Sequence, residues 1–530
     1  MKRYLKLLVP YLFFTFICVC LTPRSLQNDT FYLVKLGDGL WNFGADFKDH
    51  YTYLADLTYS YPHFLFNLLC YGAYAAFSFF GIYALSILLY FLFAASLFYI
   101  LKSSLKSSRV PFSRNVLPFL LTLLVVVLMT SFVTARSQVL TYTFFLWELF
   151  FLEKLLVEKS SRTLWKYTFL IPLLSWLVAM NHATIWPFFF ILFFPVFAEL
   201  FLWKILRNSF MYKNRSSLTA LRSKFFLGKE TTSPRKKNLK FLFLSLLFSV
   251  LVGFLTPSRI CFTATFKIMQ GTTQSYISEH APLVLISHPE ALVFFLIFWL
   301  VLAFTNSRLR PRDFFLFLGL SAMTFLSLRH IALLLCLGVF PLSRLLENLS
   351  TGINPKFFEG IEKFTPKRLA LFAVSFLTII AFFDSLDDPY LIPAIAPTAA
   401  VRFLKTRYAS NLDGLNLNET RAVSLKNPLR IYNEYNVGAY LLFEDIPVSM
   451  DSRVNIYTTP FSKNLESDLF DDYQSIRLGN SKAFDLIESY GFNVFLLYKD
   501  NSLASALARD DGFLCVFSDD NFVIYEKLSQ

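Results

Sequence analysis

A small set of acidic, basic and imidazole side chains stands out in a chain that is otherwise strongly apolar. Two carboxylates, Asp29 and Asp49, could act as general bases, because a positioned and partly desolvated carboxylate can take a proton from a hydroxyl group. The other candidates are Tyr32, His50, His63, Arg136, Gln138, Asn181, His182, Arg259, Glu279, His280, Arg329 and His330. Arginine holds phosphate through paired hydrogen bonds, and His and Asn add further donors. The set therefore suits attack of a hydroxyl on an activated carbon from which a phosphate leaves.

Each of these residues also has an ordinary structural explanation. Asp29 could be a solvated loop acid, and Arg136 could anchor a turn at lipid head groups. Asn181-His182 and Arg329-His330 sit in near-loopless breaks between apolar runs, where polar side chains satisfy backbone groups at helix ends. The sequence leaves both explanations open, and the argument for function rests on the clustering of these residues.

The composition places this cluster in a membrane protein. The 530 residues are 55% hydrophobic, include 64 Phe and are only 16% charged, whereas soluble domains carry about 25% charged residues. The mean hydropathy is +0.49. This composition argues against one large water-soluble enzyme and excludes a disordered chain.

Apolar runs long enough to cross a bilayer predict eleven membrane-spanning helices. We expect them near residues 5–22, 83–101, 114–134, 138–156, 165–180, 183–203, 240–256, 289–305, 313–328, 331–346 and 369–385. The stretch 63–80 is apolar as well, but we predict that it lies in the membrane interface without crossing. Together these helices form a polytopic α-helical domain over residues 1–386, with a first outer loop at 23–82.

The charge distribution predicts the orientation of these spans. Residues 1–386 hold 37 Lys and Arg against 17 Asp and Glu. Thirty of the 37 fall on one side if 63–80 does not cross, and cytoplasmic loops accumulate positive charge. The N-terminus is therefore predicted inside and the C-terminal domain outside the cell membrane, with all six His at the outer side. The net charge of +13 thus reflects topology and gives no reason to expect a nucleic-acid partner. The basic loop 204–240 either sets the topology or contacts anionic membrane lipids.

Residues 387–530 predict a small extracytoplasmic α/β domain. They hold 13 Lys and Arg against 20 Asp and Glu, the opposite balance to the rest of the chain. Short apolar strands are expected at RIYNEY, PVSMD, NVFLLYK, FLCVFSD and NFVIYEK, separated by helical stretches such as SKAFDLIESY and SLASALARD. Asp451 and Arg453 are either a structural ion pair or part of an acceptor-binding surface.

The sequence lacks the usual motifs of nucleotide and zinc chemistry. It contains no CxxC, HExxH, P-loop, GxGxxG or GxSxG pattern, so no cofactor or metal site is predicted, although use of a divalent metal stays open. Six Cys, four of them in or near apolar segments, do not indicate a disulfide framework. An outward-facing site without ATP needs an activated donor that arrives through the membrane, and a lipid-phosphate sugar meets that need.

Short motifs along the chain resemble a known superfamily. NDTFYLVKLGDGL, which follows the first apolar run, resembles the start of the first outer loop in membrane glycosyltransferases of the GT-C superfamily, which includes protein mannosyltransferases and aminoarabinose transferases. A largely uncharacterised bacterial GT-C-like group is similar over most of the chain. The motifs that carry this similarity are ARSQ, MNHATIW, TPSR, SEHAPL, LRHIALL, YNEYNVGAYLLFE and VSMDSRVNIY.

The resemblance implies roles for several residues. Asp29 with Tyr32 matches the position of the catalytic acid and the Tyr that often follows it, and Asp49 would correspond to a second acidic position in the same loop. Interfacial helices of that loop would explain the stretch 63–80. The implied activity is transfer of a sugar from a polyprenyl-phosphate donor to a glycan, lipid or protein acceptor at the outer face. Two rivals stay open, namely a catalytically silent GT-C-like scaffold in envelope assembly and a transporter of lipid-linked saccharides.

Overall fold

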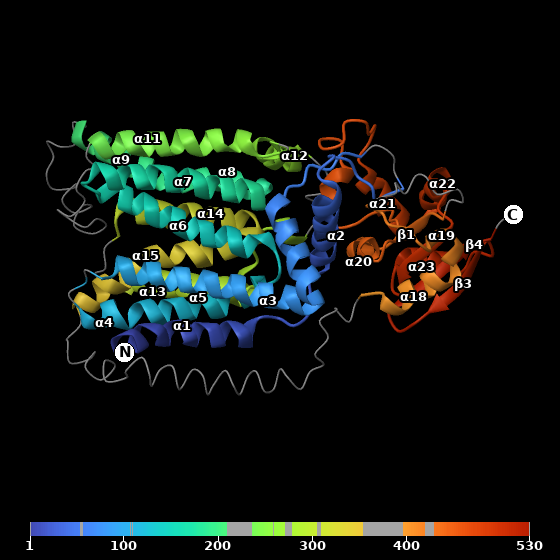
Figure 1. The fold of residues 1–530 in the computed structure, drawn as a ribbon, viewed down its shortest axis with the longest axis horizontal. Helices are drawn as coiled ribbons and strands as arrows, with labels where there is room; N and C mark the ends of the chain where they lie inside the picture. Colours follow the sequence, from blue (N-terminus) through green and yellow to red (C-terminus); the bar gives the residue numbers. More distant parts are fainter. Residues whose placement is uncertain are drawn as a thin grey trace. The chain divides into compact units, whose positions relative to one another are not determined.

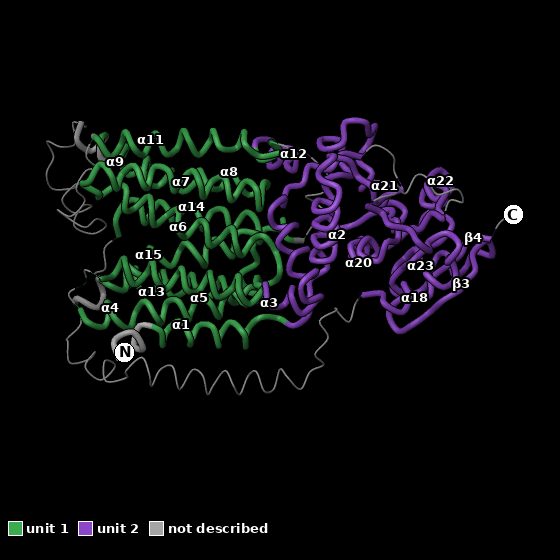
Figure 2. Tube along the Cα trace, viewed as in Figure 1, with its two compact units in different colours: residues 1–23, 86–261, 278–388 green, residues 24–85, 262–277, 389–530 purple. Residues whose placement is uncertain are grey.

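Two compact units, each assembled from segments far apart in the sequence, make up the chain (Figure 2). The computed structural model describes residues 2–53, 57–106, 108, 110–208, 236–257, 259–270, 278–304, 309–352, 396–418 and 429–528. Unit 1 comprises residues 1–23, 86–261 and 278–388, and unit 2 comprises residues 24–85, 262–277 and 389–530. Residues 24–85, which we had assigned to the membrane domain as its first loop, thus cluster with the C-terminal part of the chain.

Unit 1 is a bundle of helices that run side by side (Figure 1). Its helices are α1 (Lys2–Leu21), α4 (Pro111–Asn115), α5 (Leu117–Leu128), α6 (Ser137–Val157), α7 (Ser161–Asn181), α8 (Trp186–Ile191), α9 (Phe194–Asn208), α11 (Lys236–Leu251), α13 (Pro289–Phe304), α14 (Pro311–Leu326) and α15 (Ile331–Gly352). The second part of α3 (Phe64–Ser104), from residue 86 on, also belongs to this unit. Helix α7 packs between α6 and α11, and α14 packs against α9 and α15. Short 3-10 turns connect several of these helices at their ends, among them η7 (Ser278–His280) and η9 (Leu328–His330).

The lengths and composition of the helices identify a multi-pass membrane protein. Helical stretches long and apolar enough to cross a membrane are Phe64–Ser104, Ser161–Asn181, Ala183–Leu202, Lys237–Leu255 and Leu328–Glu347. Shorter apolar helices cover Leu8–Leu21, Leu117–Leu128 and Pro289–Phe304. The number of eleven spans stays a prediction, and the span expected at 369–385 lies outside the described residues.

Helix α3 (Phe64–Ser104) is interrupted about one third of the way along its length, at Phe77 and Ser78. Phe77 has φ −142° and ψ 21°, and neither angle is helical. Ser78 has φ 54°, a positive value that residues other than glycine rarely adopt. Next to the break, the backbone approaches so closely that a Cβ on Gly81 would lie 1.9 Å from the Ala73 carbonyl oxygen. The stretch that we predicted as an interfacial helix, 63–80, is therefore separated by a backbone break from the helix that follows it.

Unit 2 contains a four-stranded mixed sheet. Its strands are β1 (Ile431–Asn433), β2 (Val494–Tyr498), β3 (Phe513–Ser518) and β4 (Phe522–Lys527), in the order β1-β2-β4-β3. Strand β1 is parallel to β2, whereas β4 is antiparallel to both β2 and β3. The central strand β2 is the most apolar, VFLLY, and is buried along most of its length, as expected for a strand covered on both faces.

Short helices surround this sheet. They are α18 (Thr398–Arg407), α19 (Ala409–Leu412), α20 (Gly438–Phe443), α21 (Leu469–Arg477), α22 (Ser481–Tyr490) and α23 (Ser502–Leu507). Local sequence explains the ends of α22: the Asn480 side chain accepts a hydrogen bond from the Ala483 N–H, and Gly491 ends the helix with φ 65°. Between them, Ala483 and Ile487 are four residues apart and both are buried.

Within unit 2, the first loop packs tightly against the C-terminal part of the chain. Helix α2 (Asn28–Phe43) lies against α20, and Lys35 on α2 donates a hydrogen bond of 2.7 Å to Asp445. A Cβ on Gly37 would lie 2.1 Å from the Asn67 carbonyl oxygen, so α2 and the first part of α3 meet with no room for a side chain. The segment 447–451, predicted as a strand, forms instead one isolated bridge in which Val448 pairs with Thr52 of the loop. All six cysteines are free thiols.

Candidate active site

Asp29 stands in the first turn of α2, a few residues after the end of α1. The position is favourable for a carboxylate, because the N-terminus of a helix carries the positive end of the helix dipole. Its side chain is half-buried, and Tyr32, three residues further and on the same side of the helix, is buried. Half-burial at a helix N-terminus is an environment in which a carboxylate can both meet a substrate and be held in place.

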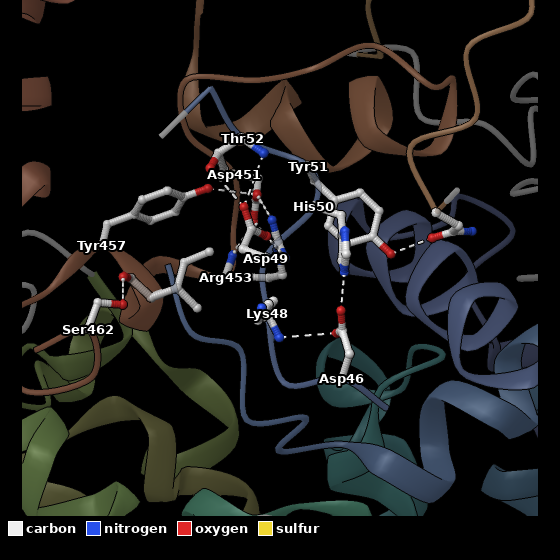
Figure 3. Close-up of polar contacts among 12 residues, drawn as sticks. Asp46, Lys48, Asp49, His50, Tyr51, Thr52, Asp451, Arg453, Tyr457 and Ser462 are labelled. Atoms are coloured by element: carbon white, nitrogen blue, oxygen red, sulfur yellow. Dashed lines mark hydrogen bonds and ion pairs between the residues drawn. The ribbon is translucent and has the colours of Figure 1, made fainter. Parts of the chain in front are cut away.

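Asp49 lies in a different environment, a closed ionic cluster with Arg453 and Asp451 (Figure 3). Arg453 donates to Asp49 Oδ1 at 2.6 Å, and the Thr52 N–H and hydroxyl donate to Asp49 Oδ2 at 3.1 and 2.8 Å. Arg453 also donates to both oxygens of Asp451, at 2.9 and 2.6 Å. Both oxygens of Asp49 are thus occupied, and its side chain is 0% exposed.

Aromatic rings complete the burial of Arg453. The guanidinium carbon lies 5.0 Å from the centre of the Tyr51 ring and 5.3 Å from that of Tyr59, within the range of cation–π attraction. Burial alone would lower the pKa of Arg453, but the charges of Asp451 and Asp49 hold that pKa well above its usual range. The first loop is therefore fixed to the C-terminal part of unit 2 by one buried cation shared between two carboxylates.

The two remaining candidates of the first loop have local partners. His50 lies 2.6 Å from Asp46, an exposed carboxylate four residues earlier. The carbonyl group of His63 accepts a hydrogen bond from the Asn67 N–H at the start of α3. Asp29, Tyr32, Asp49, His50 and His63 all belong to unit 2, whereas the other nine candidates belong to unit 1.

In unit 1, two of these candidates converge on a third, the acid Glu279. Arg136, immediately before α6, lies 3.2 Å from one carboxylate oxygen of Glu279, and Arg329 in η9 lies 3.6 Å from the other. The backbone supports this arrangement, because Ser327 donates its hydroxyl to the Glu279 carbonyl oxygen at 3.0 Å and the Leu328 N–H donates to Ala281 at 3.0 Å. We call Arg136, Glu279 and Arg329, with the adjacent His280 and His330, the Glu279 cluster.

The Glu279 cluster is partly open to solvent and carries an excess of positive charge. The side chains of Arg136, Arg329 and Glu279 are 22%, 38% and 42% exposed. Burial opposes ionisation of Glu279, but the two guanidinium groups outweigh it and lower the pKa of the carboxyl. Burial and the Arg329 charge lower the pKa of His280, so its imidazole stays neutral to a lower pH than a free histidine. Two cations around one carboxylate leave a net positive site that suits an anion.

Four further candidates lie at or near the ends of helices of unit 1. Asn181 and His182 are 2% and 6% exposed. The Asn181 side-chain amide donates to the Leu177 carbonyl oxygen at 2.8 Å and so provides a partner for a carbonyl group in the last turn of α7. Gln138 is in the first turn of α6. Arg259 is exposed and has φ 52°, an uncommon left-handed conformation for a residue other than glycine.

Sequence reasoning missed a second charged group of unit 1, which we call the Arg310 network. Arg310 makes paired hydrogen bonds to Asp313 at 2.7 and 2.8 Å and to Glu153 at 3.1 and 3.1 Å. Arg312, Arg344 and Glu199 complete it with ion pairs of 3.3–3.4 Å. On α6, Glu153 lies 17 residues after Arg136, or about 25 Å at 1.5 Å per residue. The network therefore sits at the opposite end of α6 from the Glu279 cluster.

We expect the variant Arg310→Gln to destabilise the bundle by about 3–5 kcal/mol, because it removes one partner of a buried ionic group and leaves Glu153 and Asp313 short of a cation. The matched control is Arg162→Gln, since Arg162 is exposed at the start of α7 and a surface substitution changes stability by about 0.5 kcal/mol or less. Thermal unfolding of the purified chain in one detergent measures both. Equal melting of the two variants would contradict a stabilising role of the network.

Within the part of the chain that the structure describes, no three or more His, Cys, Asp or Glu side chains are grouped so that they could hold a metal ion.

Comparison with known proteins identifies the fold. No protein-family model and no curated protein sequence matches the chain. Among solved structures, the archaeal oligosaccharyltransferase AglB from Archaeoglobus fulgidus, in complex with an inhibitory peptide and a dolichol-phosphate, superposes with a TM-score of 0.56 and 12% identity. The match covers 98% of this chain and 74% of that one. The same enzyme in its apo form gives 0.54 and 13%, over 93% and 69% of the two chains.

The chain has the GT-C fold. ArnT from Cupriavidus metallidurans bound to undecaprenyl phosphate is also similar, at a TM-score of 0.49 and 12% identity over 99% of this chain and 98% of that one. The superfamily resemblance expected from the short motifs is confirmed at the level of the fold. At these identities a GT-C fold does not by itself assign an activity, which must be argued from the residues.

Proposed function

We propose that this protein is a membrane glycosyltransferase that uses a polyprenyl-phosphate sugar as donor. The observation that carries the proposal is the convergence of Arg136 and Arg329 on Glu279 in a chain with the GT-C fold. A guanidinium presents five N–H donors, so each of these two can contact a phosphate in addition to Glu279. The solved neighbours hold dolichol-phosphate and undecaprenyl phosphate, which are anions of this chemical class.

In the proposed reaction, an acceptor hydroxyl attacks the anomeric carbon of the donor sugar. The new bond joins the acceptor oxygen to that carbon, the bond to the phosphate oxygen breaks, and Asp29 takes the hydroxyl proton. Arg136 and Arg329 would neutralise the negative charge that develops on the departing lipid phosphate. His280, neutral because of its lowered pKa, would act as a hydrogen-bond partner that adds no further charge.

Asp49 fits a positioning role better than direct contact with the acceptor. Both of its oxygens are hydrogen-bonded and its side chain is fully buried, so a substrate hydroxyl cannot reach Asp49 without displacing these contacts. We therefore propose that Asp49 holds the first loop, and with it the chain around Asp29, in a fixed conformation. Tyr32, His50, His63, Gln138, Asn181, His182, Arg259 and His330 stay proposed substrate-binding residues.

The proposal includes a location and an orientation. Action at the outer face of the cell membrane is supported by the excess of Lys and Arg in the loops predicted to be cytoplasmic. The acceptor is a glycan, lipid or protein of the cell envelope, and the domain that holds β1–β4 would lie on the same side as the acceptor.

A transfer assay with labelled donors tests the function. Membranes that contain the chain are offered polyprenyl-phosphate sugars one at a time, and we expect labelled product from at least one of them. In the purified protein, Arg329→Gln should lower kcat/KM for that donor about 10–100-fold, since a charge-assisted hydrogen bond contributes about 1.5–3 kcal/mol. The matched control is Arg402→Gln, an exposed arginine on α18. Absence of product with every donor, together with an unaltered set of surface glycans on deletion of the protein, would reject the proposal in favour of a silent scaffold.

A further inference from the structure

Unit 2 contains a pocket that the proposed catalytic chemistry does not use. It is a small pocket that opens to solvent, and the empty space of about 470 Å3 around its lining residues includes solvent in front of the mouth. Small-molecule sites commonly have mostly apolar and aromatic walls and a few placed polar groups. The residues that matter here are Tyr53, Arg430, Asp472, Tyr473, Tyr490 and Phe492.

Aromatic rings form the walls of the pocket and are held in fixed orientations. Tyr490 stacks on Phe492 with ring centres 5.6 Å apart and 27° between the planes, and Tyr432 stacks on Tyr473 at 5.3 Å and 20°. The Tyr490 hydroxyl donates to Asp472 at 2.7 Å, and the Tyr432 hydroxyl donates to the Tyr473 carbonyl oxygen at 3.1 Å. These contacts fix the four rings in place without a ligand. Tyr432, Tyr473 and Phe492 are buried, so Tyr490 is the ring of the four that is more open to solvent.

Two opposite charges accompany this aromatic wall. Arg430 is exposed and uses one of its terminal nitrogens, Nη1, to donate to the Tyr490 carbonyl oxygen at 2.6 Å. Asp472 is half-exposed and receives the Tyr490 hydroxyl on Oδ2. Among the described residues, neither the second oxygen of Asp472 nor Nη2 of Arg430 has a protein hydrogen-bond partner. The pocket therefore offers a charged acceptor and a charged donor beside an aromatic face.

We propose that this pocket binds one pyranose ring of a saccharide. A pyranose has a flat face of C–H groups, which suits the Tyr490–Phe492 wall, and a rim of hydroxyls that both donate and accept hydrogen bonds. Hydroxyls would donate to Asp472 and accept from Arg430, and such charge-assisted bonds are the strong ones. A purely apolar occupant would make no use of either charged group.

The position of Tyr53 connects this pocket to the first loop. Tyr53 lines the pocket and stands four residues after Asp49. Its N–H donates to Val448 at 3.3 Å, and its hydroxyl donates to Pro447 at 2.9 Å. The inference rests on the proposed function in one respect, which is that the bound saccharide would belong to the acceptor or donor of the same transferase.

The test is saturation-transfer-difference NMR on the full chain in lipid nanodiscs. The probes are methyl glycosides of glucose, galactose, mannose and N-acetylglucosamine, and the matching disaccharides. We expect ring-proton signals for at least one probe, and Asp472→Asn and Arg430→Gln should each weaken its binding about tenfold or more, since each removes a charge-assisted hydrogen bond. The matched control is Asp485→Asn, because Asp485 is exposed on α22 and does not line the pocket.

The outcomes distinguish a failure of the saccharide pocket from a failure of the proposed transferase function. Saccharide signals that survive Asp29→Asn and disappear in Asp472→Asn support the pocket whether or not transfer is detected. If transfer is detected but no probe gives signals that depend on Asp472 or Arg430, the pocket assignment is wrong and the proposed function stands. If a library of unstructured nonapeptides gives such signals and the saccharides give none, the pocket binds peptide and the inference is overturned.

Discussion

The variant Asp29→Asn is expected to lower kcat of sugar transfer about 10²–10⁴-fold, the range over which a positioned general base contributes. Asparagine keeps the size of the side chain and its place in the first turn of α2, but its amide cannot take a proton from the acceptor hydroxyl. The KM for the lipid donor should stay nearly constant, because the donor is proposed to be held by Arg136 and Arg329. Initial rates with the labelled donor that gives product in membranes measure both constants.

A matched acidic residue controls for the charge change. Asp413→Asn removes an exposed carboxylate of unit 2 after α19 and should leave the rate unchanged. Both variants should melt at the wild-type temperature, which separates a chemical defect from a folding defect. Wild-type kcat in Asp29→Asn would remove Asp29 from the mechanism, even if the protein proves to be a glycosyltransferase.

The variant Arg453→Gln is expected to have a large effect on folding, a loss of about 3–5 kcal/mol in the stability of unit 2. Glutamine leaves two carboxylates, Asp49 and Asp451, buried side by side without their shared cation. Arg453→Lys should fall between wild type and Gln, because an ammonium carries the charge but cannot bridge both acids in the planar geometry of a guanidinium.

Limited proteolysis and thermal unfolding in nanodiscs measure this loss. The double variant Asp49→Asn/Arg453→Gln should recover part of the stability, since it removes one of the two stranded charges. Arg509→Gln, at an exposed position after α23, is the control. If Arg453→Gln resists protease as well as wild type, the cluster contributes nothing measurable to holding the first loop.

Local patterns in the sequence predict part of unit 2 well. SKAFDLIESY coincides with α22, and strands lie at four of the five expected segments. The exception, PVSMD, has alternating apolar residues, but its partner is the first loop, where Thr52 and Val448 are 396 residues apart in the sequence. No pattern within a short window reveals a partner at that separation, and the same limit hid the contact between Asp49 and Arg453.

The sequence predicts which charged residues belong to the candidate site, but it does not predict which of them contact one another. The sequence indicates Arg136, Glu279 and Arg329 because they stand at the ends of apolar runs, yet only the fold reveals that the two arginines share one acid. Arg310 and Arg312 are among the thirty basic residues of the predicted cytoplasmic side, but they lie in the buried Arg310 network. The signal that could have found it is the presence of Glu153 and Glu199 in or beside predicted spans, where an ionisable group needs a partner.

The link between Asp49 and Arg453 also sets an order of events during biosynthesis. The two residues are 404 positions apart, so at about 5–20 residues per second the loop exists for roughly 20–80 s before its cation is made. During that interval Asp49 remains solvated, and α2 has no α20 to pack against. Unit 2 can acquire its folded stability only after nearly the whole chain has been synthesised, so the loop that carries Asp29 reaches its final conformation at the last stage of folding.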